Sequence, residues 1–261
     1  MKFILPQQYF SKIMRAIVEF DLIQSNDRIL IGLSGGKDSI LLTYAMAMMR
    51  ERLKKPFSLG ALTINPKFSE DFDISRLSDF CRSLDIPFES QEVDIAEIIR
   101  NHPEKSPCFS CAFFRRGSIN RYAVEHGFNK IAYVHHHDDA VETLLMGLFY
   151  SGQIQTFTPK TYLDRTGLTV IRPLIYLREY ETVEAIKYHG FKPVPSPCPH
   201  DGKTTRQTVK ELIASLSKDN PMLYDHLSSA MRQNNLGELW PASKTRKEMA
   251  DVYKSYMYPE E

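Results

Sequence analysis

The sequence contains no long hydrophobic run and no strong excess of charge of either sign. No stretch of its 261 residues approaches the roughly eighteen consecutive apolar residues that a membrane-spanning helix requires. The opening residues are not followed by a small-residue cleavage site, which disfavours a secretory signal. Internal repeats and low-complexity tracts are also missing. We therefore expect a globular protein that stays in the cytosol and has no membrane partner.

The charge balance limits how the protein could bind nucleic acid. Its 33 Lys and Arg residues against 32 Asp and Glu residues give a formal net charge of +1. This charge is too close to neutral for a protein that binds nucleic acid over its whole surface. An RNA partner would have to be met by a local basic patch. Three segments could supply one, although each alone is more typical of a solvated face. They contain Arg115, Arg116 and Arg121; Lys203, Arg206 and Lys210; and Lys244, Arg246 and Lys247.

Cysteine is scarce, with four residues in the chain: Cys81, Cys108, Cys111 and Cys198. In a reducing cytosol these should not form structural disulfides, and the close spacing of Cys108 and Cys111 indicates metal or redox chemistry. Cys81 lies in a segment of mixed helical pattern, and we interpret it as a buried structural thiol.

Strand-like and helix-like segments alternate along most of the chain. Short apolar runs predict strands at Arg28–Leu33, Phe57–Ile64, Phe88–Val93, Lys130–His135 and Leu168–Ile171. Helical spacing predicts helices at Ser39–Leu53, Asp71–Leu84, Phe113–Glu125 and Asp138–Tyr150. Strands joined by helical crossovers favour an α/β fold with a doubly wound, mostly parallel sheet.

We predict three regions: a helical lead-in over residues 1–24, the α/β domain over 25–203, and a helical tail over 204–261. The polar segment Ser151–Asp164 is predicted to be a flexible loop. The segment Pro193–Pro199 is rich in proline, which excludes a helix and should hold Cys198 in an extended turn.

The strongest local signal is the segment Ser34-Gly35-Gly36-Lys37-Asp38-Ser39, between a predicted strand and a predicted helix. Two glycines let the backbone approach a phosphate closely, and the helix start offers unpaired N–H groups and a positive dipole end. Ser34 and Ser39 add hydroxyl donors, Lys37 adds charge, and Asp38 can hold Mg²⁺. The spacing is not that of a Walker A motif. A serine-capped glycine turn would explain part of this pattern but not all of it.

Here the sequence resembles the PP-loop ATP pyrophosphatases. The resemblance implies cleavage of ATP between the α- and β-phosphates, activation of a carbonyl oxygen as an adenylate, and displacement of AMP. A cradle on the pyrophosphate suits that chemistry because it stabilises the leaving group as charge develops.

A second segment, His135-His136-His137-Asp138-Asp139 with Glu142 and Thr143, resembles the HHxDDxxET motif that lines the ATP site of PP-loop tRNA-modifying enzymes. Two carboxylates at a helix start also interact favourably with the helix dipole, so a purely structural role would explain them equally. The consecutive histidines could suggest a metal site, but neighbours along a strand point to opposite faces. Those enzymes usually have glycine where this chain has Val134.

The cysteines admit several interpretations. Cys108 and Cys111 form a CxxC motif in a loop that we expect to enter a helix, and Cys198 lies far along the chain. A CxxC motif can be a redox pair, half of a zinc site or part of a cluster site. Cys108, Cys111 and Cys198 with His200 would satisfy tetrahedral zinc. Thiolates alone would hold a 4Fe-4S cluster with one iron open to a sulfide.

The layout as a whole resembles the tRNA 2-thiocytidine-forming (TtcA) family and its uridine-thiolating relative, over nearly the full length. The shared features are SGGKDS, the PCFSC segment with Arg115-Arg116-Gly117, the DDxxET helix, the segment Val170-Ile171-Arg172-Pro173-Leu174, and the late DNPMLYDHLSSAM. The resemblance implies a 4Fe-4S cluster held by Cys108, Cys111 and Cys198. It also implies ATP and Mg²⁺ at Ser34, Gly35, Gly36, Lys37, Asp38 and Ser39, with His136, Asp139 and Arg172 near the nucleotide. By the same resemblance Lys37, Asp38, Cys108, Cys111 and Cys198 are the catalytic residues.

The resemblance implies an ATP-dependent tRNA sulfurtransferase, with 2-thiocytidine as the expected product and 2-thiouridine as the alternative. Cytidine enzymes commonly have a second CxxC around the third ligand, whereas this chain has Cys198-Pro199-His200, as in the uridine relative. The zinc-ribbon cysteine pairs of that relative are missing here. The sulfur donor, a cysteine desulfurase or inorganic sulfide, stays open. So does a homodimer, which is common in the family.

Three other interpretations remain. One is a cluster-free thiolase in which Cys111 and Cys198 carry a persulfide and alternate as a redox pair. A second is a zinc-stabilised nucleotide- or RNA-binding protein without thiolation. The third is an enzyme that acts on a small molecule rather than tRNA. The base on which a tRNA enzyme acts must be exposed or flipped out, which suits an unpaired loop nucleotide.

Overall fold

The fold is built on one six-stranded sheet. The computed structural model describes residues 4–69, 72–101, 107–188, 192–195, 204–232 and 245–250, together with Gly190 and Cys198. The strand order is β3-β2-β1-β4-β6-β5, and all neighbours are parallel except β5 and β6. The strands are β1 Arg28–Gly32, β2 Ser58–Asn65, β3 Phe88–Glu92, β4 Lys130–Ala132, β5 Lys160–Leu163 and β6 Leu168–Ile171. The predicted doubly wound, mostly parallel class is confirmed.

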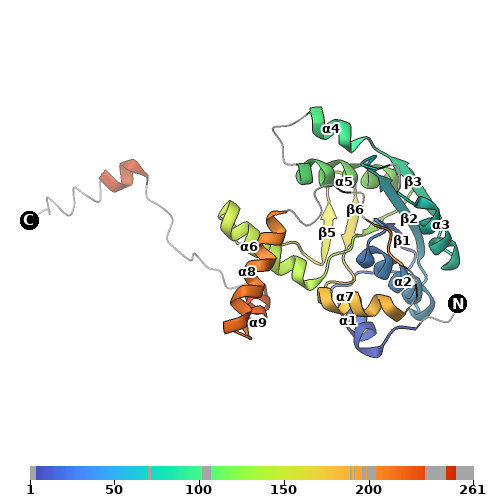
Figure 1. Ribbon diagram of the computed structural model, residues 1–261, viewed down its shortest axis with the longest axis horizontal. Helices are drawn as coiled ribbons and strands as arrows, with labels where there is room; N and C mark the ends of the chain where they lie inside the picture. Colours follow the sequence, from blue (N-terminus) through green and yellow to red (C-terminus); the bar gives the residue numbers. More distant parts are fainter. Residues whose placement is uncertain are drawn as a thin grey trace, which may run out of the picture.

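Helices cover both faces of this sheet (Figure 1). One face packs against α1 (Gln7–Glu19), α2 (Lys37–Arg52), α3 (Ile74–Ser83) and α7 (Glu179–Ala185), whose apolar residues share one buried cluster with the strands. The other face packs against α5 (Pro107–Glu125), with α4 (Ile95–Asn101) beside it. Beyond the sheet lie α6 (His137–Ser151), α8 (Thr205–Asp219) and α9 (Leu223–Ala230). A short 3₁₀ turn, Ile186–Tyr188, follows α7.

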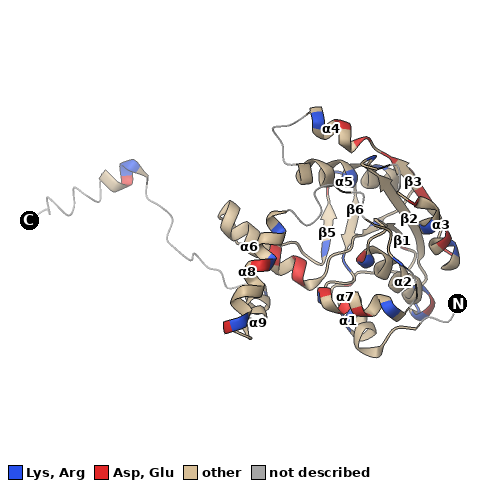
Figure 2. Ribbon diagram, viewed as in Figure 1, with Lys and Arg blue, Asp and Glu red and all other residues tan. Residues whose placement is uncertain are grey.

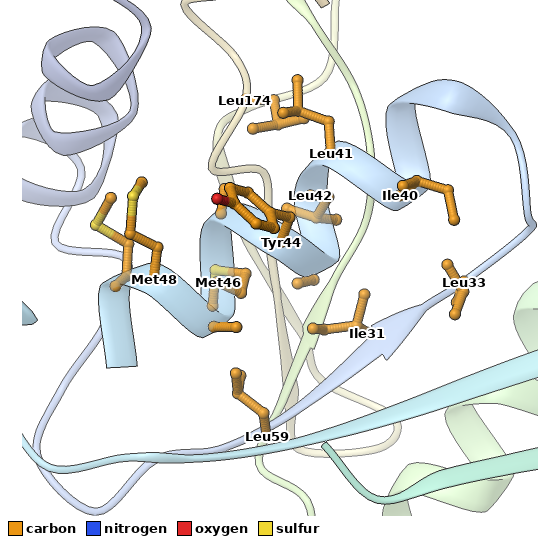
Figure 3. Packing of buried hydrophobic residues seen from close by; sticks show 14 of the residues in the cluster. Ile31, Leu33, Ile40, Leu41, Leu42, Tyr44, Met46, Met48, Leu59 and Leu174 are labelled. Atoms are coloured by element: carbon orange, nitrogen blue, oxygen red, sulfur yellow. The ribbon is translucent and has the colours of Figure 1, made fainter. Parts of the chain in front are cut away.

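The helix that follows β1 is the centre of the larger core. Every residue from Ser39 to Met49 is buried. The protein therefore encloses α2 on all sides, whereas an amphipathic surface helix buries only one apolar stripe. Figure 3 shows Ile40, Leu41 and Leu42 among Ile31, Leu33 and Leu174, while Met46 lies near Leu59. Because this helix cannot shift without disturbing a close-packed interior, its first turn is a rigid support for the loop before it.

Two local predictions were wrong. The segment predicted as a flexible loop, Ser151–Asp164, contains β5, which pairs antiparallel with β6 at the edge of the sheet. Its residues alternate between exposed and half-buried, as expected of an edge strand, so no continuous apolar run marks it. The CxxC motif lies inside α5 and not in a loop, because the helix begins at Pro107. Proline is favoured at a first helical position, where its missing N–H costs nothing.

The predicted regional limits at residues 24 and 203 stay predictions. The lead-in helix α1 contributes Tyr9, Ile13, Ala16 and Ile17 to the same buried cluster as α2. In the predicted tail, Thr204 caps α8 by accepting a hydrogen bond from the Gln207 N–H. Trp240 and Lys244 lie outside the described residues. None of the helices that the structure describes is long and apolar enough to cross a membrane.

Candidate active site at the carboxyl ends of the strands

The phosphate loop lies between β1 and α2, as predicted. Gly35 has a φ of +86°, and Gly36 caps α2 without a side-chain hydrogen bond, which leaves the first N–H groups of the helix open. The Ser34 hydroxyl donates to Ser39 Oγ at 3.1 Å, and that hydroxyl donates to the Gly36 carbonyl at 2.9 Å. The open N–H groups and the helix dipole suit an anion such as a phosphate.

We expect Gly35→Ala to lower the free energy of unfolding by about 1–3 kcal/mol, because a side chain is strained at a positive φ. The added Cβ would also lie 3.2 Å from Val194 Cβ. Gly36→Ala is the matched control: its φ is −68° and the nearest atom to its Cβ, Ser34 Oγ, is 3.7 Å away. Urea unfolding of both variants checks this, and equal losses would contradict it.

Lys37 and Asp38 form an ion-paired group with α7. Lys37 Nζ lies 2.8 Å from Asp38 Oδ2 and 3.5 Å from Glu179 Oε1, while the Thr182 hydroxyl donates to Asp38 Oδ1 at 2.6 Å. Glu179 also pairs with Lys210 of α8. Burial works to lower the pKa of Lys37, but its bonds to Asp38 and Glu179 raise the pKa above the ordinary value. Lys37 therefore keeps its charge, and Glu179 is a member of the site that we did not predict.

The predicted second motif opens α6. His136 and Asp139 form a capping box, in which the Asp139 carboxylate accepts from the His136 N–H at 2.9 Å and His136 Nδ1 accepts from the Asp139 N–H at 3.3 Å. The three histidines separate: His135 lies 4.7 Å from the Phe157 ring, and His137 Nδ1 lies 2.6 Å from the Tyr224 hydroxyl. They do not form a common metal site.

The helical tail holds this motif in place. Arg206 Nη1 lies 3.2 Å from Asp139 Oδ1 and 3.0 Å from Glu142 Oε2, and its Nη2 donates to Thr143 Oγ1 at 3.2 Å. Of the second candidate basic patch, Lys203 lies outside the described residues, whereas Arg206 and Lys210 are engaged with acidic partners. Figure 2 shows acidic and basic positions interspersed on α8. These two residues therefore serve the site's internal pairing more than an RNA-binding face.

Arg178 connects α6, α7 and α9. Its Nε lies 3.0 Å from Asp138 Oδ1, and its guanidinium carbon lies 3.1 Å from the centroid of the Tyr224 ring. The Glu179 N–H donates to Asp138 Oδ2 at 2.7 Å. Burial acts to raise the pKa of Asp138, but the hydrogen bond and charge of Arg178 outweigh it and hold that pKa below its ordinary value.

A carboxyl group with a depressed pKa stabilises the fold above its unfolded-state pKa, near 3.8 for Asp138, and loses that contribution as the pH falls through the folded-state value. We expect Arg178→Met to cost about 1–3 kcal/mol at pH 7, with the difference from the wild type shrinking below about pH 4. Unfolding measured between pH 3 and 7 checks this. Arg165→Met, at an exposed position, is the control, and a pH-independent loss would contradict the assignment.

The cysteines of the predicted cluster site approach one another. Burial raises the pKa of Cys111, the charge of Arg115 lowers it, and Cys198 and Cys108 both raise it, so both thiols are close enough to interact with Cys111. Within the described residues, however, no three His, Cys, Asp or Glu side chains are arranged to hold a metal ion. His200, the fourth ligand of the zinc alternative, lies outside these residues. Cys81 is fully buried in the core, where desolvation raises its pKa to about 12.

A cavity of about 960 Å³ opens beside the phosphate loop and α5. Gly32, Leu33 and Ser34 line one side, and Arg115 and Arg116 line another. Of the predicted nucleotide residues, Ser34 and Arg172 border this cavity. Lys37 and Asp38 belong to the ion-paired group with α7, and His136 and Asp139 form the capping box of α6; these four are not among the residues that line the cavity. Sequence reasoning missed two other lining residues, Asn120 and Tyr133, because nothing in their local pattern separates them from ordinary core positions.

Known proteins resemble this chain over most of its length. A family model described as a PP-loop domain matches residues 6–216. A tRNA-cytidine(32) 2-sulfurtransferase of Citrifermentans bemidjiense is 32% identical over 241 residues, covering 91% of this chain and 94% of that relative. The chain belongs to the TtcA family of PP-loop proteins. A second TtcA-family relative of the same name, from Geobacter metallireducens, is 35% identical over 222 residues, covering 83% of this chain and 86% of that relative.

Solved structures agree on the PP-loop fold. The U34-tRNA thiolase NcsA from Methanococcus maripaludis, solved with its 4Fe-4S cluster, matches with a TM-score of 0.73 at 21% identity, covering 91% of this chain and 85% of that chain. At this identity the likeness concerns the fold alone. The roles of individual residues in this member of the TtcA family therefore rest on its own geometry.

Proposed function

We propose that the protein is an ATP-dependent tRNA sulfurtransferase that replaces the 2-oxygen of a cytidine with sulfur. The observation that carries the proposal is the shared cavity: Ser34 of the phosphate loop and Arg115, which follows the CxxC motif on α5, border the same space. An ATP-activated base and a sulfur source could therefore meet there. The relatives named tRNA-cytidine(32) 2-sulfurtransferase support tRNA as the substrate and cytidine as the base.

The first step is adenylation. The 2-oxygen of the base attacks the α-phosphorus of ATP, a new P–O bond forms, and the bond to the β-phosphate breaks to release pyrophosphate. The open N–H groups of α2 and the charged Lys37 would hold the β- and γ-phosphates and stabilise the leaving group. We propose Asp38 as the carboxylate that takes Mg²⁺, with Thr182 fixing its orientation through the 2.6 Å hydrogen bond.

The second step is sulfur substitution. A sulfur nucleophile attacks C2 of the base, and the C2–O bond breaks to release AMP. Cys108, Cys111 and Cys198 would together supply an all-thiol donor set, whose chemistry fits an iron–sulfur cluster, and the interactions of Cys111 with the other two thiols support this. A 4Fe-4S cluster bound there would supply the sulfur at an iron that the protein leaves open. Burial raises the pKa of Cys111, and the charge of the adjacent Arg115 opposes that rise and would favour the thiolate needed for ligation.

The proximity of Cys111 and Cys198 also supports a second candidate, the cluster-free thiolase. In that reaction a persulfide on one cysteine supplies the outer sulfur, and attack by the other thiol forms a disulfide that a thiol reductant must reopen. The two candidates share the adenylation step and differ in their need for iron.

The test is a reaction of anaerobically purified protein with ATP, Mg²⁺, sulfide and unmodified tRNA. We expect pyrophosphate and AMP to form in step with 2-thiocytidine, and only when tRNA carries cytidine at position 32, the position in the relatives' names. Tandem mass spectrometry of digested tRNA identifies the product. ATP binding without tRNA-dependent pyrophosphate release would contradict the proposed function, and 2-thiouridine as the product would correct the base.

A further inference from the structure

Four side chains that line the cavity each have one buried polar atom without a hydrogen-bond partner. Among the described residues, the buried polar atoms without a partner are Asn120 Oδ1, Tyr133 Oη, His135 Nδ1 and Arg172 Nε. All four residues line the cavity beside the phosphate loop. Buried polar groups are rarely left unsatisfied, since each costs about 1–3 kcal/mol. Their concentration around one space indicates a polar ligand that completes them.

Three of these residues follow the carboxyl ends of the adjacent strands β4 and β6, and the fourth, Asn120, lies on α5. Tyr133 follows β4, its N–H donating to the Ile171 carbonyl at 3.0 Å. Arg172 follows β6, and its Nη1 donates to the Thr158 carbonyl at 2.6 Å and to Thr161 Oγ1 at 3.1 Å. These bonds fix the guanidinium and leave Nε–H unused. We refer to Asn120, Tyr133, His135 and Arg172 as the polar wall.

The polar wall is mostly uncharged. Burial, followed by the charge of Arg172, lowers the pKa of His135 to about 3, so its ring is neutral at pH 7. Burial raises the pKa of Tyr133, which keeps its hydroxyl protonated. The ligand therefore meets an amide, a phenol, a neutral imidazole and one guanidinium N–H. Such a set offers both donors and acceptors, as the edge of a nucleobase requires.

We infer that the polar wall seats the target cytosine and positions its 2-oxygen for adenylation. This inference rests on the proposed function. Cytosine presents two acceptors, O2 and N3, and one amino donor, N4. The Arg172 Nε–H and Tyr133 O–H groups can donate to the acceptors, and Asn120 Oδ1 can accept from the amino group. Phe157, which touches both the His135 ring and the Arg172 guanidinium, supplies an apolar surface beside them.

The competing occupant is the adenine of ATP. The cavity is also lined by apolar residues, Leu33, Leu62, Ile64 and Ile119, which suit the faces of a purine. When the phosphates of ATP lie on the loop, its adenine can therefore pack against this apolar surface. In the polar wall, Asn120 belongs to α5, the helix that carries the CxxC motif, and Tyr133 interacts with the charge of Arg116 on the same helix. This placement favours the base that must receive sulfur.

Tyr133→Phe tests the inference because it removes one hydroxyl and keeps the ring. Its matched control is Tyr122→Phe, whose ring stacks on His126 outside the cavity lining. With tRNA, Mg²⁺ and ATP, we expect Tyr133→Phe to lower kcat/KM for tRNA about tenfold, and Asn120→Ala with Tyr133→Phe about a hundredfold. The KM for ATP should stay within about twofold. The control should behave as the wild type, and thermal unfolding confirms that each variant is folded.

A second measurement does not depend on catalysis. An anticodon-loop hairpin carrying fluorescent pyrrolocytidine at the target position should change its emission when the base leaves the stack and enters the wall. We expect this change with wild type and Tyr122→Phe and its loss in the double variant. A raised KM for ATP with an unchanged hairpin signal would assign the wall to adenine and overturn the inference. Unchanged tRNA kinetics and emission would also overturn it. A wild type that gives the emission change without pyrophosphate release would contradict the proposed function and leave base seating supported.

Discussion

Lys37→Met should lower tRNA-dependent pyrophosphate release by about a hundredfold or more. The ammonium is the cation nearest the open helix start, and removal of one preorganised group that stabilises developing charge typically costs about 10²–10³ in rate. Methionine keeps most of the side-chain volume, so the fold should persist. Pyrophosphate release at saturating ATP and tRNA is the measurement.

Two comparisons make the Lys37 result specific. Lys55→Met, at a side chain that is 49% exposed and pairs only loosely with Asp21, should leave the rate unchanged. Loss of Lys37 also frees Asp38 and Glu179 from their shared cation, so unfolding must be measured alongside the rate. A loss smaller than about threefold with an intact fold would show that the loop does not act on the leaving pyrophosphate.

Cys198→Ala should abolish bound iron. Protein purified without oxygen should contain about four irons and four acid-labile sulfides per chain, and the variant almost none. Thiolation should disappear, whereas pyrophosphate release should persist within a few fold, because the phosphate loop does not use this thiol. Elemental analysis and the two product assays on the same preparation separate the cluster from the adenylation step.

The matched control for that experiment is Cys81→Ala. Cys81 is fully buried in the core, so its replacement should cost stability and leave the metal content unchanged. Cys108→Ala and Cys111→Ala should behave as Cys198→Ala does. About one zinc per chain without iron would contradict the cluster. Absence of both metals after reconstitution, with thiolation retained, would establish the persulfide route.

Local sequence patterns predicted those parts of the site that lie within one segment. The phosphate loop could be placed because glycines, a preceding strand and a following helix occur together. The mostly parallel class of the sheet also follows from the alternation of elements, whereas the strand order was known only from the structure. Single residues that reach the site from distant elements gave no such signal. Glu179, Arg206 and Tyr224 look like ordinary surface or core positions until the chain folds and brings them to α6 and α2.

Two members of the polar wall, Asn120 and Tyr133, escaped prediction for a different reason, whereas Arg172 was expected near the nucleotide and His135 lies in the predicted second motif. Asn120 lies within α5 and Tyr133 stands one residue beyond a buried strand, where an amide or an aromatic side chain is ordinary. Only the absence of a partner for their buried atoms distinguishes them, and that depends on every neighbouring side chain. The edge strand β5 was missed because its half-exposed pattern resembles that of a polar loop.

The segment before Cys198 is anchored at the nucleotide end of the protein. The Val194 N–H donates to the Gly35 carbonyl at 2.9 Å, and Arg76 Nη2 donates to the Lys192 carbonyl at 3.0 Å. Only three residues lie between Val194 and Cys198, so the Cα atom of Cys198 can lie at most about 14 Å from that of Val194. The rate at which a thiol reagent labels Cys198 would thus report changes in the conformation of the phosphate loop. A substitution that disturbs the backbone around Gly35 or Val194 should therefore alter the position of Cys198 as well as that of the phosphate loop.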